Sequence, residues 1–410
     1  MLATPGKEGI LKELSRPIDE ISIIDLVDSI LAYANDARTS DIHIDPSEKN
    51  VAIRFRIDGV MNEAFEVPND IHSEIVSRIK VLSGLRTDEH QIAQDGRFKF
   101  QTPDKKTRFD VRVSIVPTYY GENAILRLLS DQGQTMSLKN IGLSERDYLK
   151  VEHSIHKPYG MILATGPTGS GKTTTLYTIL HELNTPDVSI ITIEDPIEYS
   201  LEGIDQIQVN NQTGLTFANG LRAILRQDPN VIMVGEIRDE ETASISVNAA
   251  LTGHLLLSTI HTNDAPTTLP RLLDMKIESF LIASTVNIAI GQRLVRRICP
   301  HCKEKKEYSL AAIEALRAEI PAKLLEGENS FYVGVGCGEC NKSGYRGRIG
   351  IYEVLEVTDA IREAIVNHMG AGEIKKLAIH EGMTTMLEDG FRKVKEGVTT
   401  IEEIIRVVHE

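Results

Sequence analysis

Hydrophobic and polar residues in the first 130 positions follow helix spacing in some segments and strand spacing in others. Ile21–Ala37 carries apolar side chains three and four residues apart, which predicts an amphipathic helix, and Ile71–Leu82 predicts a second one. Apolar and polar residues alternate, as in half-buried strands, over Ser40–Asp45, Val51–Ile57, Gly96–Gln101, Arg108–Val116 and Asn123–Leu128. We therefore expect a small α+β domain over residues 20–130, with a flexible leader over 1–19 and a polar linker over 131–140.

Past this linker, short and wholly apolar runs alternate with helical patterns. The apolar runs are Met161–Thr165, Ser189–Ile193, Val231–Val234 and Leu255–Ile260. Thr173–Leu183 has the spacing of a helix, and four more helical segments occupy Asp359–His409. Buried strands that alternate with helices predict an α/β fold with a mostly parallel sheet covered on both faces.

Composition narrows the class of protein. The chain of 410 residues carries a net charge of −14, so we do not expect nucleic acid as a partner. No apolar run approaches the roughly 20 residues that span a bilayer, and residues 1–17 lack the pattern of a secretory signal. We expect a soluble, cytoplasmic protein.

One motif points to phosphate chemistry. The sequence GPTGSGKT follows the strand that ends at Thr165, leads into a helix and matches the P-loop pattern. Glycines let backbone N–H groups converge on phosphate oxygens, Lys172 should reach the β- and γ-phosphates, and the Thr173 hydroxyl should bind Mg²⁺. The motif thus predicts ATP with Mg²⁺, bound by Gly166, Pro167, Thr168, Gly169, Ser170, Gly171, Lys172, Thr173 and Thr174.

Acidic residues end two of the apolar strands. Glu194 follows Ile193, and Glu236 comes two residues after Val234. Ligands bind at the carboxyl ends of the strands of such sheets, so both carboxylates should face the P-loop. We assign Mg²⁺ binding to Glu236 and activation of the attacking water to Glu194, although the two roles are exchangeable. Asp239 and Glu198 are instead expected to cap helices.

Two histidines flank the strand Leu255–Ile260. Beside a γ-phosphate, His254 or His261 can donate a hydrogen bond that depends on whether the phosphate is present, and the alternative for each is a purely structural role.

The four cysteines form two Cys-x-x-Cys pairs, and 34 residues separate the pairs. This spacing predicts a structural zinc site with four thiolate ligands, Cys299, Cys302, Cys337 and Cys340. The separation exceeds that of the shortest zinc ribbons, and a helical insertion would account for it. Two disulfides, or unconnected buried thiols, are the alternatives.

Together these motifs resemble those of the type II secretion and type IV pilus assembly ATPases. The P-loop is followed by a segment similar to the family's aspartate box, by Walker B and histidine boxes, and upstream by two motifs of the preceding domain. The segment similar to the aspartate box is residues 193–199, and the Walker B region is residues 221–229 with 234–239. The histidine box runs from residues 252–254 to 261–264, and the two upstream motifs are residues 40–44 and 94–97. The tetracysteine motif resembles the assembly and secretion members rather than the pilus-retraction ones.

The resemblance implies a homo-hexameric ring with four parts to each chain. These are a PAS-like domain over 20–130, a RecA-like ATPase core over 141–292, a zinc subdomain over 293–355 and a C-terminal helical subdomain over 356–410. It also implies that Arg97 and Arg112 of the first domain contact nucleotide phosphates, where surface ion pairs are the alternative. Further arginines that match positions around the site and the subunit interfaces are Arg222, Arg226, Arg238 and Arg271.

The function that the resemblance implies is that of a cytoplasmic motor, peripheral at the inner face of the membrane. It would hydrolyse ATP to assemble a type IV pilus or a type II pseudopilus through an inner-membrane platform protein, with only indirect membrane contact. A RecA-like nucleic-acid motor and a nucleotide-gated scaffold with little turnover are the alternatives. Two departures from the family pattern are Asn230, where aspartate is common, and an N-terminal docking domain that is missing or was removed.

Overall fold

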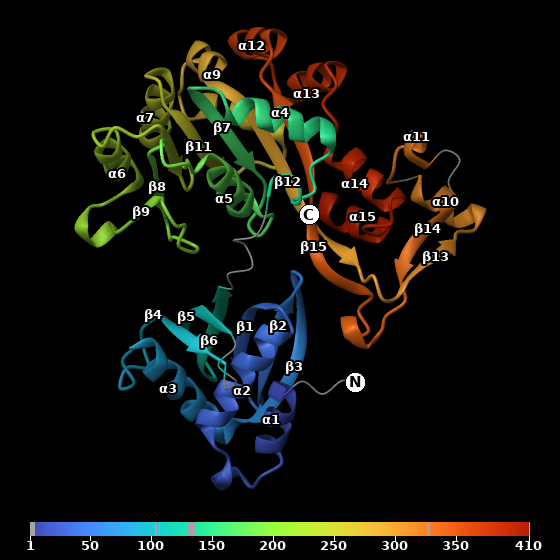
Figure 1. Ribbon diagram of the computed structural model, residues 1–410. Helices are drawn as coiled ribbons and strands as arrows, with labels where there is room; N and C mark the ends of the chain where they lie inside the picture. Colours follow the sequence, from blue (N-terminus) through green and yellow to red (C-terminus); the bar gives the residue numbers. More distant parts are fainter. Residues whose placement is uncertain are drawn as a thin grey trace. The chain divides into compact units, whose positions relative to one another are not determined.

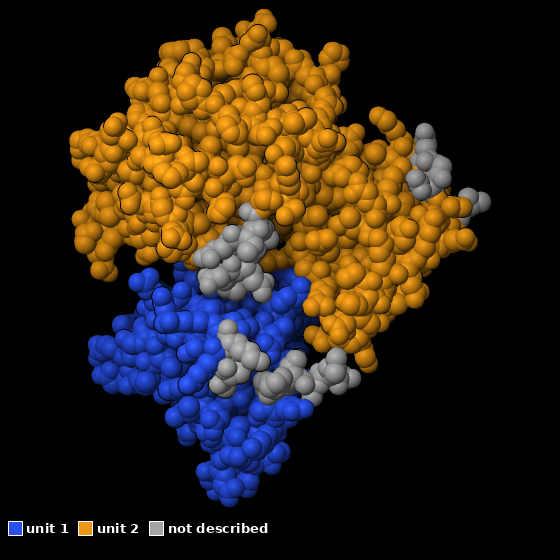
Figure 2. Space-filling view, viewed as in Figure 1, with its two compact units in different colours: residues 1–132 blue, residues 133–410 orange. Residues whose placement is uncertain are grey.

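The chain divides into two compact units, residues 1–132 and 133–410, which Figure 2 colours separately. The computed structural model describes residues 5–102, 105, 107–129, 137–317, 319–325 and 329–409. Among the helices within these ranges, none is both long enough and apolar enough to cross a bilayer.

The first unit is a six-stranded antiparallel sheet with helices packed on its apolar face (Figure 1). The strands lie in the order β3-β2-β1-β6-β5-β4. Their bounds are β1 Thr39–Pro46, β2 Asn50–Ile57, β3 Val60–Pro68, β4 Gln94–Gln101, β5 Arg108–Thr118 and β6 Gly121–Leu129. The helices are α1 Pro5–Leu14, α2 Ile23–Asp36 and α3 His72–Ser83. In β2, β5 and β6 buried apolar residues alternate with less buried ones and pack with α2 and α3, so the opposite face of the sheet carries the polar side chains.

This unit confirms the expected α+β class, both predicted helices and the five predicted strands, and it adds two elements. The sequence did not reveal β3, an edge strand in which only Val67 is buried, because its apolar alternation is weak. Residues 5–14, expected to belong to a flexible leader, form α1 instead. Pro5 is compatible with the first turn of a helix, and Ile10 is fully buried in the core of the unit.

The second unit is built on a seven-stranded sheet in the order β15-β12-β7-β11-β10-β8-β9. Every neighbouring pair is parallel except β12 with β15, so the expected mostly parallel sheet is confirmed, with an antiparallel strand at one edge. The bounds are β7 Gly160–Thr165, β8 Ile190–Glu194, β9 Asp205–Gln208, β10 Val231–Val234, β11 Leu255–Ile260, β12 Val286–Ile298 and β15 Tyr345–Glu356.

Helices cover both faces of this sheet, as the apolar strands require (Figure 1). One face packs against α4 Glu145–Ile155 and α5 Lys172–Leu183. The other packs against α6 Phe217–Ile224, α7 Glu240–Leu251, α8 Ala265–Asp274, α9 Ser279–Thr285, α12 Asp359–Val366 and α13 Ala371–His380.

Beyond the main sheet, β13 Lys303–Glu307 and β14 Ser330–Gly334 form a hairpin. The helical insertion expected between the cysteine pairs is present as α10 Leu310–Leu316 and α11 Ala322–Leu325. A separate core joins this region to α14 Met386–Lys395 and α15 Ile401–His409.

The expected boundaries of the last two subdomains do not coincide with breaks in the structure. Position 292/293 falls inside β12, and position 355/356 falls inside β15, because both strands continue from the main sheet into the cysteine-bearing region. α12 and α13 pack on the main sheet, whereas α14 and α15 pack on the other core. Most of the expected linker lies outside the described residues, and Leu138 at its end is buried in the second unit.

Candidate functional site

The P-loop connects β7 to α5, as the sequence predicts. Three of its glycines have positive φ, with values of +143° at Gly166, +80° at Gly169 and +90° at Gly171, which side chains rarely tolerate. A Cβ on Gly166 would also lie 2.5 Å from the carbonyl oxygen of Gln292 on β12. The loop is therefore held close to the sheet by backbone geometry that requires glycine.

The amino end of α5 is suited to bind phosphate. Its N-cap, Gly171, has no side chain to accept hydrogen bonds from the N–H groups of the first turn, and no acidic residue lies in that turn. These N–H groups carry partial positive charge that favours an anion. Thr173 and Thr174 are half-buried in the same turn. The residues at this end thus fit a nucleotide phosphate group.

Lys172 is directed back over the loop. Its Nζ donates to the carbonyl oxygens of Gly166 (2.7 Å) and Pro167 (3.0 Å), and its side chain is buried. Burial lowers the pKa of Lys172 to about 8, although the negative charge of Glu236 opposes this effect. Lys172 is therefore a cation at neutral pH, but it loses its proton more readily than an ordinary lysine.

The carboxyl ends of four parallel strands bring the predicted residues to one edge of the sheet. Thr165, which precedes the P-loop, pairs with Ile260 of β11, and Val234 of β10 pairs with Ile193 of β8. Glu194, Glu236 and His261 follow these paired positions directly or within two residues. The structure therefore places both predicted carboxylates and one predicted histidine at the edge of the sheet that carries the P-loop.

Glu236 is buried and receives two basic partners. Its Oε2 accepts hydrogen bonds from His261 Nε2 (3.1 Å) and forms an ion pair with Arg238 Nε (2.5 Å). The side chains of Arg238 and His261 are 67% and 47% exposed, so both can move without disturbing the core. Arg238 and His261 thus lie in direct contact with the carboxylate assigned to Mg²⁺.

Glu194 is enclosed by a different set of donors. The Tyr177 hydroxyl of α5 donates to Oε2, while Thr192 Oγ1 (2.6 Å) and Gln206 Nε2 (3.2 Å) donate to Oε1. Its side chain is buried, and burial acts first to raise the pKa of Tyr177, with the charge of Glu194 acting in the same direction. Sequence reasoning missed these donors because three different elements contribute them.

His254 lies away from this edge. It precedes Leu255, which pairs with Gly160 at the start of β7, and the Gly160 N–H donates to the His254 carbonyl (3.1 Å). The six residues of β7 separate it from the P-loop by about 17 Å. The structure therefore does not bring His254 into the cluster of its own chain. Asn230 lies at the same far end, where its Oδ1 accepts from the Ser189 N–H (2.8 Å).

In the first unit, the two arginines expected at the phosphates are neighbours. Arg97 on β4 is directly opposite Arg112 on β5, and Arg112 is directly opposite Arg127 on β6. Their side chains point to the polar face of the sheet, because the buried residues Phe98 and Val111 alternate with them. Arg127 also bonds Asp41 (2.8 Å). Sequence reasoning missed Arg127, although its alternation with the buried residues Leu126 and Leu128 places it on the same face.

The remaining arginines are exposed on the second unit. Arg222 of α6 pairs with Glu241 (2.7 Å), and Arg226, in the turn after α6, donates to the Arg222 carbonyl (2.8 Å). Arg271 is exposed on α8. Within the described part of this chain, none of the three forms a hydrogen bond or an ion pair with the P-loop or its carboxylates.

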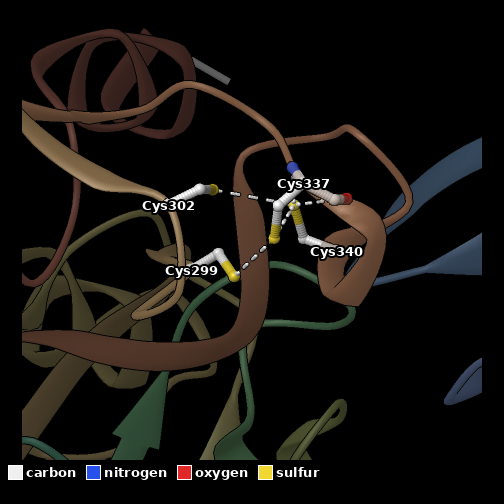
Figure 3. A group of neighbouring side chains, drawn as sticks. All are labelled: Cys299, Cys302, Cys337 and Cys340. Carbon is white, nitrogen blue, oxygen red and sulfur yellow. Dashed lines mark hydrogen bonds between the residues drawn. The ribbon is translucent and has the colours of Figure 1, made fainter.

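The four cysteines meet at one point (Figure 3). The first two come from the segment after β12, Cys337 is the N-cap of the short helix Gly338–Cys340, and Cys340 is its last residue. The Sγ–Sγ distances are 3.9 Å for Cys299–Cys337, 3.8 Å for Cys302–Cys340 and 3.7 Å for Cys337–Cys340. Sulfurs at about 2.3 Å from a tetrahedral zinc ion lie about 3.8 Å apart, whereas disulfide sulfurs are bonded at about 2.05 Å. The cluster therefore fits a zinc ion.

Backbone groups support the thiolate form of one ligand. The N–H groups of Cys337 (3.2 Å) and Gly344 (3.3 Å) donate to Cys340 Sγ. Burial acts to raise the pKa of Cys340, but these hydrogen bonds outweigh it and bring the pKa to about 7. The donor set is that of a structural site, since four protein ligands leave no open coordination position.

Comparison with known proteins identifies the relatives of this chain. Residues 17–406 match the model of the family described as Type II/IV secretion system protein. The type IV pilus assembly ATPase PilB of Myxococcus xanthus is 45% identical over 395 residues, which cover 96% of this chain and 69% of that protein. The type II secretion system protein E of Pseudomonas aeruginosa is 47% identical over 399 residues, 97% of this chain and 78% of that protein.

Solved structures agree with this relationship. The pilus retraction motor PilT with bound ADP is 27% identical, with a TM-score of 0.62 over 93% of this chain and 96% of that one. The ATPase DotB of Legionella pneumophila has a TM-score of 0.69 at 21% identity over 97% of this chain and 98% of that one, which shows the shared fold. The expected fold class is thereby confirmed. The chain belongs to the type II/IV secretion system protein family and is an ATPase of that family.

Proposed function

We propose that this chain is the motor of a filament-assembly machine, which hydrolyses ATP to ADP and phosphate to extend a type IV pilus or a type II secretion pseudopilus. One observation carries the proposal. The P-loop, Glu194, Glu236 and His261 follow neighbouring strands at one edge of one sheet, which is where ligands bind in open α/β sheets. Relatives named for pilus assembly and for type II secretion support the client class.

Each residue of this edge has a role that its chemistry supports. The P-loop N–H groups and Lys172 bind the phosphates, and Thr173 and Glu236 hold Mg²⁺, which would neutralise charge on the β- and γ-phosphates. Glu194 accepts the proton of the attacking water or orients it. His261, which already bonds Glu236, donates to the γ-phosphate and so distinguishes ATP from ADP.

The first unit completes the site in this proposal. Arg97 and Arg112 lie on one polar sheet face, where adjacent guanidinium groups repel each other and gain from a polyanion between them. If the unit closes over the nucleotide only during turnover, these charges stabilise the transition state in the closed form and couple hydrolysis to domain motion. Arg222, Arg226, Arg238 and Arg271 serve the site or the interfaces between subunits.

The assembly and its partners follow from the family. The motor acts as a homo-hexamer at the cytoplasmic face of the inner membrane, where it contacts the membrane indirectly, through a platform protein. Zn²⁺ held by the four cysteines stabilises the hairpin of β13 and β14 and the segments beside it, because a short hairpin is not stable by itself.

Steady-state phosphate release tests the proposal against its alternatives. Lys172→Ala should abolish Mg²⁺-dependent turnover and weaken binding of a fluorescent ATP analogue, whereas Lys157→Ala, outside the loop and the site, should change neither. Unimpaired turnover in Lys172→Ala would contradict the proposal.

Two further measurements separate the alternatives. Stimulation of turnover by added DNA, lost at high salt, would favour a nucleic-acid motor. Nucleotide-dependent conformational change with no phosphate release would favour a scaffold.

A further inference from the structure

The helix α5 carries the buried hydroxyl of Tyr177, which has no part in the proposed binding of the nucleotide phosphates. Tyr177 lies four residues after Thr173, so the two share one face of the helix about 6 Å apart along its axis. Its ring is buried against Tyr199, at 4.7 Å between ring centroids, and its hydroxyl donates to Glu194 Oε2. The helix that presents Lys172 and Thr173 to the nucleotide is thereby bonded to the residue assigned to the water.

The same hydroxyl also joins the segment between β8 and β9. It accepts hydrogen bonds from the Glu198 N–H (3.4 Å) and from Gln206 Nε2 (3.4 Å). Gln206 in turn donates to Glu194 Oε1 (3.2 Å) and to the Tyr199 carbonyl (3.2 Å), and its Oε1 accepts from the Leu201 N–H (2.7 Å). The carboxylate of Glu194 is therefore fixed by α5 on one oxygen and by its own sheet on the other.

We propose that Tyr177 is a positioning residue for hydrolysis. Its hydroxyl fixes the position of the Glu194 carboxylate relative to α5, so that the carboxylate can bond the water that attacks the γ-phosphate. This inference rests on the proposed ATPase function and deepens it. A general base must lie within hydrogen-bond reach of its water, and a displacement of about 1 Å costs up to about a hundredfold in rate. A tyrosine on α5 supplies this constraint, because it moves with Lys172 and Thr173.

Tyr177 faces Glu194 as a neutral phenol, which can donate a hydrogen bond to the carboxylate. The charge of Glu194 acts on Tyr177 and also on Tyr199, whose ring packs against that of Tyr177. Both tyrosines are held neutral at physiological pH, since burial and the nearby carboxylates raise their pKa values.

Tyr177→Phe removes the hydroxyl and keeps the ring. We expect kcat for ATP to fall at least tenfold with KM little changed. Tyr199→Phe is the matched control, because Tyr199 belongs to the same aromatic pair and, among the described residues, its hydroxyl forms no hydrogen bond with Glu194. It should leave kcat and KM as in the wild type.

A double variant distinguishes positioning from folding. In a Glu194→Gln background, Tyr177→Phe should cause no further loss of kcat, because the group that it positions is already absent. A further tenfold loss there, or loss of ATP-analogue binding in Tyr177→Phe, would assign Tyr177 to structure alone and overturn the inference. If the wild type releases no phosphate, the proposed function itself fails, whereas active wild type with Tyr177→Phe equal to Tyr199→Phe refutes only the inference.

Discussion

Replacing Arg97 by glutamine should stabilise the first unit while it impairs the enzyme. Arg97 lies directly opposite Arg112 on the polar face of the sheet. Like charges at opposite positions of neighbouring strands destabilise a sheet by roughly 0.2–1 kcal/mol. Two adjacent guanidinium groups can bind an anion between them, so the pair is suited to the phosphates of ATP.

The expected gain in stability is about 0.5 kcal/mol at low salt, and it should shrink as salt screens the repulsion. Hydrogen–deuterium exchange of the β4 and β5 amides in the intact chain measures the opening free energy of this unit locally. In the same variant, we expect ATP turnover to fall at least tenfold, since a charge-assisted phosphate contact is worth roughly 1.5–3 kcal/mol.

The matched control is Lys99→Gln, two residues along the same strand and on the same face. Lys99 lies opposite Asp110, so its removal breaks an attraction and should destabilise β4 slightly, without loss of turnover. The reasoning is refuted if Arg97→Gln loosens β4 and β5 as Lys99→Gln does, or if it keeps wild-type turnover.

Three further predictions concern other parts of the second unit. Metal analysis should find one zinc per chain in the wild type and none in Cys299→Ser/Cys337→Ser, with faster amide exchange over 299–344; a wild type without zinc would end this claim. Because Lys172 has a pKa of about 8 and binds phosphate as a cation, kcat/KM for ATP should fall about tenfold per pH unit above pH 8, and a flat profile to pH 9.5 would contradict it. Hydrogen bonds from Arg406 and Arg296 outweigh burial and lower the pKa of Glu403 from 4.5 to about 2. The stabilising effect of Glu403 is therefore present above pH 4.5 and lost as the pH falls toward 2. Glu403→Gln should lower the free energy of unfolding at pH 7, measured with urea, by about 2 kcal/mol, a value that allows for the solvent exposure of the two arginines. Equal stability of the two proteins at pH 7 would contradict this.

The elements that the sequence predicted are those in which one physical signal dominates. β10 and β11 have the predicted bounds, because wholly apolar runs of four to six residues between polar turns have few alternatives. β3 was missed because an edge strand buries little, and β12 because its apolar and polar positions do not alternate along its thirteen residues. α1 was missed because Pro5 and Gly9 suggested a loop, whereas packing on the core overrides that preference.

The candidate site shows the same limit. The P-loop, Glu194 and Glu236 could be placed from sequence, because each follows a recognisable strand and carboxyl ends of parallel strands meet. His254 was misplaced relative to its own P-loop, since a histidine before a strand and a histidine after it lie at opposite ends of the sheet. Tyr177 and Gln206 were not predicted, because their role depends on hydrogen bonds from α5 and β9 to Glu194 on β8, and no local sequence pattern encodes these contacts.

The central claim is that the carboxylates at the edge of the sheet hydrolyse ATP bound by the P-loop, and single-turnover phosphate release with Mg²⁺ tests it most directly. Glu194→Gln and Glu236→Gln should each bind the ATP analogue within about threefold of the wild type and release phosphate at least a hundredfold more slowly. Wild-type release by both variants would contradict the account.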